Sequence, residues 1–260
     1  MIKNSSQQDN GDRENGDIPS GVIFGRNSVK EALRSGRPVE CLIVERGEHK
    51  NSLSPIVSEC KKRGIPVKEA DTKKLDFMTG HGAHQGVVLV AAAHEYSSVE
   101  DILALASERG EKPFIIICDS IEDPHNLGAI IRSAEAAGAH GVIIPKRRSV
   151  GLTGIVGKAS AGALEYIPVA RVTNLVSTIE ELKKKDIWVY CADMNGEDYT
   201  KTDFSGGAAL VVGNEGSGVS RLVRESCDTV VSIPMNGKIN SLNASVAAGI
   251  IMFRIAQKRK

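Results

Sequence analysis

The sequence predicts a two-domain α/β protein whose larger, carboxyl-terminal domain contains a mainly parallel sheet. At 260 residues the chain is longer than a typical single domain. Its second half alternates continuous apolar runs with helical segments, a pattern typical of parallel strands covered on both faces. Three polar, glycine-rich segments stand at the ends of these runs, where open α/β sheets bind their ligands.

The composition is that of a globular protein from a reducing compartment. Hydrophobic residues make up 41% and charged residues 25% of the chain, and the net charge of +1 means that any affinity for a nucleic acid must come from local patches. The 5 cysteines form no CxxC pair, so we expect neither a disulfide framework nor a metal site. We find no secretion signal and no apolar run long enough to cross a bilayer, and therefore expect a cytoplasmic protein without a membrane partner.

The amino-terminal part predicts a small α/β domain after a disordered tail. Residues 1–20 have almost no apolar content and cannot bury enough surface to order the chain. We expect the domain over residues 21–93, with a strand starting near Val22 and then a helix that Asn27 caps. Residues 94–112 are predicted to form an interdomain linker with one short helix. The other predicted elements are the strands Val39–Val44, Ile65–Val67 and Gly86–Ala93, the helix Ser54–Arg63, and a cap at Asp71.

Residues 113–260 are predicted to form the second domain. Its expected strands are Phe114–Cys118, Gly141–Ile144, Ile187–Cys191, Ala208–Val212 and Thr229–Ile233. Its expected helices are Leu127–Ala137, Leu175–Lys185, Val219–Ser226 and Leu242–Ala256.

The first polar segment runs from Asp119, at a strand end, into a helix that reaches Glu135. Asn126 and Arg132 are polar among small apolar neighbours, and Gly128 permits a close approach to the backbone. A helix start with a nearby arginine suits an anionic ligand, although an ordinary exposed helical face explains the segment about as well.

The second segment, Val211–Ser220, joins a buried strand to a helix through three glycines in six residues. Such a loop lets a ligand reach main-chain amides. Arg221 stands where a dinucleotide-binding turn needs its third glycine, which argues against NAD. The stretch Leu152–Ala159 ends like a phosphate-binding P-loop but lacks the first glycine and the hydroxyl after Lys158, so ATP or GTP hydrolysis is not expected.

The third segment, Ile233–Ser245, crosses from the last strand into the last helix. Ser241 is predicted to be the N-cap of that helix, and Asn243 then falls in its first turn. Capping explains Ser241 well and Asn243 poorly, which makes Asn243 a candidate for ligand contact.

In combination, the three segments resemble the TrmH/SpoU branch of the SPOUT RNA methyltransferases. The motifs are Asn126-x-Gly128-Ala129-x-x-Arg132-x-x-Glu135, then Gly213-Asn214-Glu215-Gly216-x-Gly218, then Ile233-Pro234-Met235 followed by Ser241-Leu242-Asn243-x-Ser245-Val246-Ala247. The amino-terminal Gly25-Arg26-Asn27 and His84-Gln85-Gly86 look like the L30e-like substrate-binding domain of the subgroup that modifies a guanosine of large-subunit (23S) ribosomal RNA.

This resemblance implies an S-adenosylmethionine-dependent 2'-O-ribose methyltransferase with a trefoil-knotted sheet. Backbone groups of Gly213, Ile233 and Leu242 would hold the cofactor, with Met235 packed nearby. A homodimer would complete the active site, and no metal is implied. The residues implied around the target ribose are Asn126, Arg132, Glu215, Ser241 and Asn243. We hypothesise that Arg132 acts through its positive charge, by stabilising the developing alkoxide or placing an RNA phosphate. A general-base role is less suitable, because a guanidinium is almost never deprotonated.

The resemblance also makes Arg26 a candidate for RNA contact. Among the basic clusters, Lys146, Arg147 and Arg148 follow a predicted strand at the ligand-bearing edge and are expected to grip phosphates. Lys183–Lys185, at a helix end, has a simpler explanation as a solvated face. The alternatives left open are methylation of a transfer RNA ribose, a catalytically silent RNA-binding ribosome-assembly factor, and antibiotic-resistance methylation of an adenosine.

Overall fold

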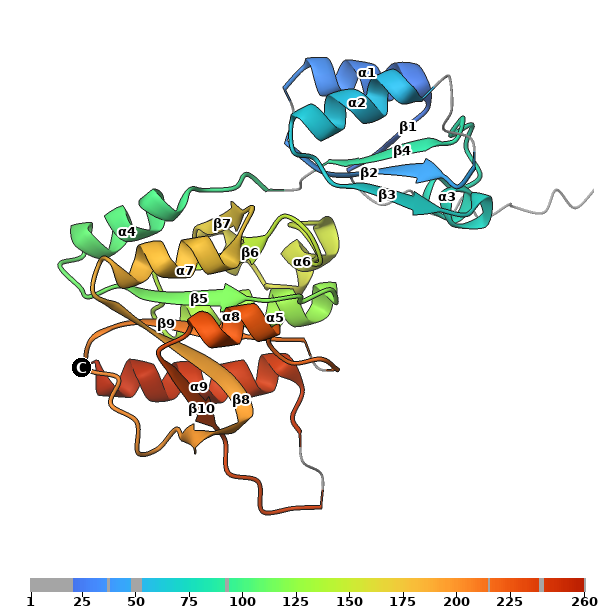
Figure 1. Cartoon of the computed structure of the whole chain (residues 1–260). Helices are drawn as coiled ribbons and strands as arrows, with labels where there is room; N and C mark the ends of the chain where they lie inside the picture. The colour runs from blue at the N-terminus through green and yellow to red at the C-terminus, as the bar shows by residue number, and fades with distance from the viewer. Residues whose placement is uncertain are drawn as a thin grey trace, which may run out of the picture.

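A computed structural model describes residues 21–36, 38–47, 53–91, 94–214, 216–238 and 241–259. It contains a smaller amino-terminal and a larger carboxyl-terminal α/β unit (Figure 1). The tail predicted over residues 1–20 lies outside the described residues.

The amino-terminal domain is a four-stranded sheet in the order β1-β4-β2-β3. Alternate residues of β2 face opposite sides of this sheet: Leu42 packs beneath the helices α1 and α2, whereas Ile43 packs with Leu75 of α3. The helix α1 begins at a Gly25 cap with φ of 83°, so Asn27 lies inside the helix and is not its cap. The elements are β1 (Val22–Phe24), α1 (Arg26–Arg34), β2 (Val39–Glu45), α2 (Ser54–Lys62), β3 (Val67–Ala70), α3 (Thr72–Met78) and β4 (Val87–Ala91).

The carboxyl-terminal domain contains a six-stranded sheet in the order β10-β8-β9-β5-β6-β7. Every neighbouring pair in it is parallel, as the continuous apolar runs predict. The edge strand β7 was not predicted from the sequence. The strands are β5 (Phe114–Cys118), β6 (Gly141–Pro145), β7 (Val169–Val172), β8 (Ile187–Asp198), β9 (Gly207–Val212) and β10 (Thr229–Ser232).

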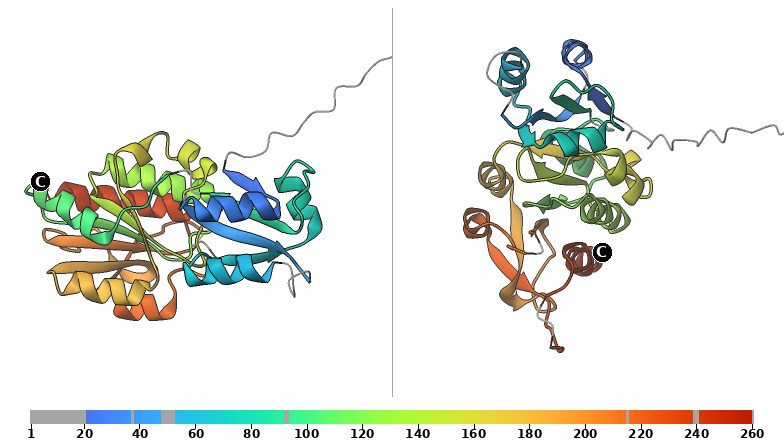
Figure 2. Two further views of the ribbon diagram at one scale, coloured as in Figure 1. Left: turned by 90° about the horizontal axis from the view of Figure 1, so that it is seen from above. Right: turned by 90° about the vertical axis from the view of Figure 1, so that its right-hand side faces the viewer.

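Helices cover both faces of this sheet (Figure 2). One face carries α5 (Pro124–Ala136), α6 (Gly154–Ala159) and α9 (Ala244–Lys258), and a short 3-10 helix, η1 (Ala163–Glu165), follows α6. The other face carries α4 (Val99–Glu108), α7 (Leu175–Lys183) and α8 (Arg221–Ser226). A mixed α/β fold with a parallel sheet is confirmed; the trefoil knot stays a prediction.

At Gly128 the backbone is approached closely by a second helix, not by an open ligand site. A Cβ atom on Gly128 would lie 2.4 Å from the Cβ of Ala159, so the glycine lets α5 and α6 touch. The stretch Leu152–Ala159, which partly resembles a P-loop, forms the short helix α6 and the turn before it.

The segment between the domains packs onto the larger one. Ile102 of α4 is fully buried against that sheet, and the Ser97 amide donates to the Val169 carbonyl at 2.9 Å. The domain boundaries themselves stay a prediction. Among the described helices, none combines the length and apolar character that crossing a bilayer requires.

Candidate functional site

The first and second polar segments meet at the carboxyl ends of β5 and β9. The Asp119 carboxylate, which is 5% exposed, accepts a 2.7 Å hydrogen bond from the Ser220 amide. The Asn214 side-chain amide donates to the Ser120 carbonyl at 3.1 Å, and Ser120 adopts a positive φ of 61°. Such strain in a non-glycine residue persists only where the surroundings enforce it, as they often do at functional sites.

Gly213 is required by the tight closure of the second segment. The amides of Asn214 and Gly218 each donate to the other's carbonyl, at 3.1 and 2.8 Å. A Cβ atom on Gly213 would lie 2.2 Å from the carbonyl carbon of Gly218, which leaves no room for a side chain.

The third segment joins the first through two asparagines. The Asn243 side-chain amide donates to the Asn126 side-chain oxygen at 2.9 Å, and Asn126 is 8% exposed. The Asn243 oxygen also accepts from the amides of Ser245 and Val246, so Asn243 is the N-cap of α9. The prediction that Ser241 caps this helix is therefore wrong; Ser241 lies two residues before the cap.

A cavity of about 610 Å³ lies where the second and third segments face the middle of β8, at residues 192–195. Gly213, Ile233, Met235 and Leu242, the four residues predicted to bind a cofactor, all line it, together with Ser241. Its volume falls in the range of small-molecule sites. The other apolar residues of the lining are Ala192, Met194, Val212, Val231, Pro234, Ala244, Ala247 and Ile251.

Asp193, which was not predicted as a site residue, also lies in the wall of this cavity. Its carboxylate accepts a 2.9 Å hydrogen bond from the Asn195 amide and lies 3.8 Å from the Arg224 Nε atom. The signal was present, because Asp193 follows the apolar run Ile187–Cys191, where the sequence predicts that the strand ends. In the structure β8 continues through polar residues to Asp198, so Asp193 lies within the strand.

Arg132 does not line the cavity of its own chain. Its side chain is exposed and has no ion-pair partner among the described residues. Arg132 stands six residues after Asn126 on α5, which separates the two by about 120° around the helix axis. Glu215, the remaining predicted catalytic residue, lies outside the described residues.

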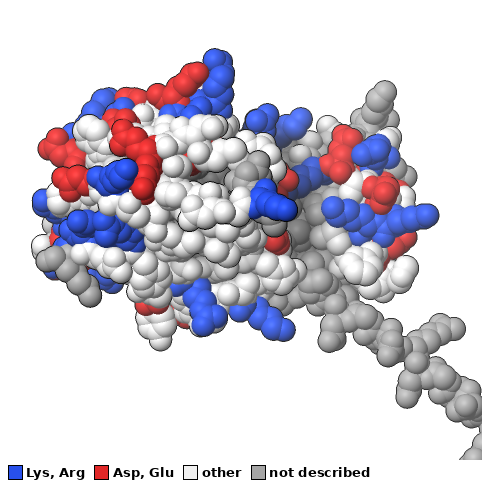
Figure 3. Space-filling view, turned by 90° about the horizontal axis from the view of Figure 1, so that it is seen from below, with Lys and Arg blue, Asp and Glu red and all other residues white. Residues whose placement is uncertain are grey.

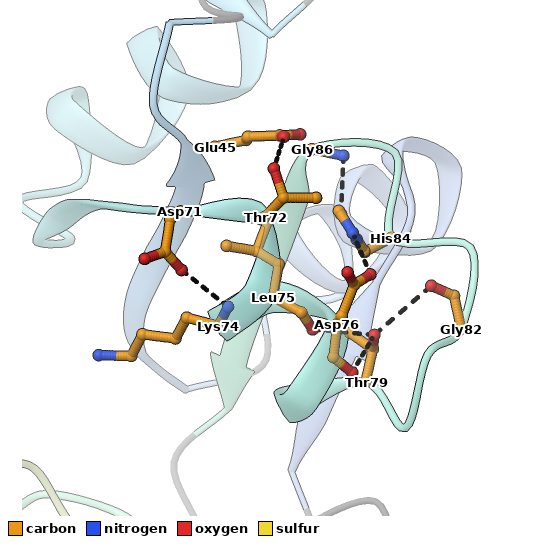
Figure 4. Close-up of polar contacts among 10 residues, drawn as sticks. All are labelled: Glu45, Asp71, Thr72, Lys74, Leu75, Asp76, Thr79, Gly82, His84 and Gly86. Atoms are coloured by element: carbon orange, nitrogen blue, oxygen red, sulfur yellow. Dashed lines mark hydrogen bonds and ion pairs between the residues drawn. The ribbon is translucent and has the colours of Figure 1, made fainter.

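The two amino-terminal motifs come together in the small domain. The Arg26 amide donates to the Gln85 side-chain oxygen at 3.0 Å, and the Arg26 Nε donates to the Gln85 carbonyl at 3.3 Å. The buried His84 ring lies 3.1 Å from the Asp76 carboxylate, and its Nδ1 accepts from the Gly86 amide at 3.0 Å (Figure 4). These contacts give His84 and Gln85 structural roles.

The basic loop Lys146–Arg148 follows β6 and is attached to the first segment. The amide of Val150 and the hydroxyl of Ser149 both donate to the Ile121 carbonyl, at 2.9 and 3.2 Å. Arg147 and Arg148 are exposed, and Arg148 adopts a positive φ of 55°. Within the described parts of the chain, no three His, Cys, Asp or Glu side chains group as metal ligands would.

Comparison with known proteins identifies the family. The model of the SpoU rRNA Methylase family matches residues 113–253, and the model for RNA 2'-O ribose methyltransferase substrate binding matches residues 22–97. YacO of Bacillus subtilis (strain 168), named for the TrmH family of tRNA/rRNA methyltransferases, is 49% identical over 238 residues, which cover 91% of this chain and 95% of its own. A relative from Staphylococcus aureus (strain MSSA476) with the same family name is 44% identical over 92% of this chain and 96% of its own.

Solved structures agree with this assignment. The SpoU methyltransferase AviRb from Streptomyces viridochromogenes, in complex with the cofactor AdoMet, has a TM-score of 0.58 and 26% identity, covering 92% of this chain and 90% of that one. An AdoMet-bound rRNA methyltransferase from Sinorhizobium meliloti has a TM-score of 0.55 and 25% identity, covering 91% and 86%. The chain belongs to the SpoU, or TrmH, family of RNA methyltransferases.

Proposed function

We propose that this protein transfers a methyl group from S-adenosylmethionine to the ribose 2'-oxygen of a guanosine in large-subunit (23S) ribosomal RNA. The observation that carries the proposal is the meeting of three distant segments: the second and third line one cavity, and the first is hydrogen-bonded to the third beside it. Gly213, Ile233 and Leu242 line it, and Asn243, next to Leu242, is hydrogen-bonded to Asn126.

The cavity fits S-adenosylmethionine in size and charge. Main-chain groups around Gly213, Ile233 and Leu242 would hold the donor, and the apolar lining suits its adenine ring. Asp193 supplies the only carboxylate in the described lining; although it lies 3.8 Å from the Arg224 Nε atom, it is 20% exposed and could still accept a hydrogen bond from the donor's ammonium group. AviRb and the Sinorhizobium meliloti enzyme, both crystallised with AdoMet, support the same donor.

For this transfer, the protein must align the ribose oxygen with the methyl group and stabilise the negative charge that develops on the oxygen. When bound, S-adenosylmethionine would supply a methyl group on a sulfonium: the ribose oxygen would bond to that carbon as the carbon–sulfur bond breaks, S-adenosylhomocysteine would leave, and the hydroxyl proton would pass to solvent water. The Asn126–Asn243 amides would orient the ribose beside the cavity. A guanidinium would stabilise the negative charge developing on the oxygen, the role we give to Arg132.

A homodimer fits the exposed position of Arg132. On α9, Val246, Ile250 and Phe253 are 50%, 36% and 47% exposed at helical spacing, and they line a shallow hollow with Ala129 and Ser133 of α5. Figure 3 shows one face of the molecule with a broad uncharged area over the larger domain. An apolar patch of this kind favours pairing with a second copy. Arg132, one turn from Ala129, would then act in the partner's site.

Ribosomal RNA is favoured by the amino-terminal domain, whose match is to a substrate-binding module. Transfer RNA is the second candidate, because the names of the relatives include both RNAs. The five free cysteines fit a reducing cytoplasm, where both substrates occur.

Mapping 2'-O-methyl groups across ribosomal and transfer RNA, from cells with and without the gene, tests the proposal. We expect one guanosine of the large-subunit RNA to lose its mark when the gene is removed. Loss confined to transfer RNA would support the second candidate, and an unchanged map would overturn both.

A further inference from the structure

A groove of about 760 Å³ runs between the two domains. One wall comes from α2 and β3 of the small domain and contains Lys61 and Lys68. The other is the basic loop Lys146–Arg148 after β6. A Cβ atom built on Gly64 would lie 3.8 Å from the Lys146 Nζ atom, so the two walls approach each other closely there.

The groove carries an excess of positive charge. Five of its cations have no ion-pair partner among the described residues: Lys61, Lys68, Lys146, Arg147 and Arg148. The only carboxylate in the described lining is Glu40, which is neutralised by Arg171. Because the whole chain carries a net charge of only +1, this groove is a local concentration of charge suited to a polyanion.

A buried ion pair fixes the two walls relative to each other. Arg171 of β7 lies 3.0 Å from the Glu40 carboxylate of β2, with side chains 10% and 4% exposed. Arg171 also donates to the Glu40 carbonyl at 2.9 Å, and the Leu152 amide donates to the Glu40 carboxylate at 2.9 Å. The Tyr96 hydroxyl contacts the same carboxylate. This network joins residues of both domains.

The groove adjoins the candidate active site. The loop that forms its second wall is hydrogen-bonded through Ser149 and Val150 to Ile121 in the first polar segment. That segment continues into α5 and Asn126. A strand bound in the groove therefore lies next to the segment that carries a predicted ribose contact.

We propose that this groove binds the sugar–phosphate backbone of the RNA beside the target nucleotide, and that the Glu40–Arg171 pair is a positioning device that holds its two walls at the required distance. The proposal rests on the proposed function for the identity of the RNA. The described lining contains lysines and arginines but no aromatic side chain, so it suits phosphates and offers no surface for stacking bases. Binding there is independent of sequence.

The test compares two doubly neutralised variants in filter binding to deproteinised 23S ribosomal RNA at several salt concentrations. Lys68→Gln/Arg147→Gln removes one charge from each wall. Lys184→Gln/Lys185→Gln removes two exposed charges before β8, which lies three strands from β6 in the sheet, and is the matched control. We expect the groove variant to bind at least tenfold more weakly at physiological salt and to lower the salt slope by roughly 1.4 to 1.8, with the control unchanged. Equal RNA affinity and equal salt slope in the two variants would overturn the proposal that the groove binds RNA.

Arg171→Met tests the positioning role, with Arg171→Lys as the conservative variant. We expect Arg171→Met to raise the KM for RNA at least fivefold while the Kd for S-adenosylmethionine stays unchanged, which also shows that the catalytic domain is folded. Arg171→Lys should recover part of the loss. An unchanged KM in Arg171→Met would refute the positioning role. RNA binding that depends on the groove without any methyl transfer would instead refute the proposed function and leave the groove standing.

Discussion

At the residue scale, Asn243 combines two roles in one side chain. Its oxygen caps α9 by accepting from the amides of Ser245 and Val246, and its nitrogen donates to Asn126. The sequence alone could not show that Asn243 is the N-cap, because serine and asparagine are about equally favourable caps and Ser241 is nearby. The bond to Asn126, 117 residues away, favours the later start of the helix.

The two roles of Asn243 can be separated by substitution. Asn243→Ala removes both and should lower the free energy of unfolding by about 1 kcal/mol, whereas Ser241→Ala should change it by less than about 0.5 kcal/mol. Asn243→Asp keeps the cap but loses the donor to Asn126. We expect Asn243→Asp to unfold like the wild type in urea yet to lose at least tenfold in kcat. Wild-type kcat in Asn243→Asp would refute a role for the asparagine pair.

His140 makes the stability of the fold depend on pH. Its Nδ1 accepts from the Phe114 amide at 2.9 Å, so its Nε2, 3.1 Å from the Glu111 carboxylate, carries the proton. Burial is the main cause that lowers the pKa of His140 below its usual 6.5, although Glu111 opposes the shift. The unfolded chain therefore binds the proton more readily than the folded one, and stability is complete above about pH 6.5 and falls on acidification.

The expected contribution of His140 is a slope of at most about 1.4 kcal/mol per pH unit between the unfolded and folded pKa values. Urea unfolding at pH 7.5 and pH 5.5 measures it. His140→Gln should lose stability less steeply than the wild type over this interval. Identical pH dependence in the two proteins would show that another group is responsible.

At the element scale, the sequence predicted the apolar parts of the strands well, but it ended β8 at Cys191, whereas the strand continues through polar residues to Asp198. It predicted the shortest elements poorly. Five strands of the larger sheet contain continuous apolar runs, which identify them in the sequence. The edge strand β7 is only four residues long and contains the charged residue Arg171. Its ion-pair partner Glu40 is 131 residues away in the sequence, so no local pattern could predict the pair. The six-residue α6 contains two glycines and carries no clear helical signal.

The turn after β9 gives a sharp test of the cavity. Gly213→Ala would push a methyl group into the Gly218 backbone, so the loop must open and its main-chain groups must move. We expect the Kd for S-adenosylmethionine, measured by calorimetry, to rise at least tenfold with the far-ultraviolet circular dichroism unchanged. Gly206→Ala is the control, because a Cβ atom there meets nothing within 4 Å. Equal donor affinity in both variants would place the donor elsewhere.

At the scale of the whole molecule, the sequence motifs named residues that a single chain does not bring together. Asn126, Asn243 and the cavity residues converge, whereas Arg132 is exposed on α5 beside the apolar patch of α9. A motif gives residue types in order, and it cannot say whether two of them serve the same site or the sites of two subunits.

Mixing two inactive variants tests whether subunits share a site. If the partner's Arg132 acts beside Asn126, dimers formed from Asn126→Ala and Arg132→Ala chains contain one intact site, and random mixing should restore roughly a quarter of wild-type activity. Phe253→Glu, which places a charge in the apolar patch, should elute as a monomer in gel filtration and lose methyl transfer. No recovery in the mixture, combined with a fully active monomeric Phe253→Glu, would refute the shared site.

The most direct test of the central claim is methyl transfer by the purified protein itself. The chain is incubated with deproteinised 23S ribosomal RNA and S-adenosylmethionine carrying a deuterated methyl group, and the RNA is digested to nucleosides for mass spectrometry. We expect deuterated 2'-O-methylguanosine with the wild type and a much smaller amount of it with Arg132→Ala. A deuterated methyl group on a base, or no transfer although the protein binds both RNA and donor, would contradict it.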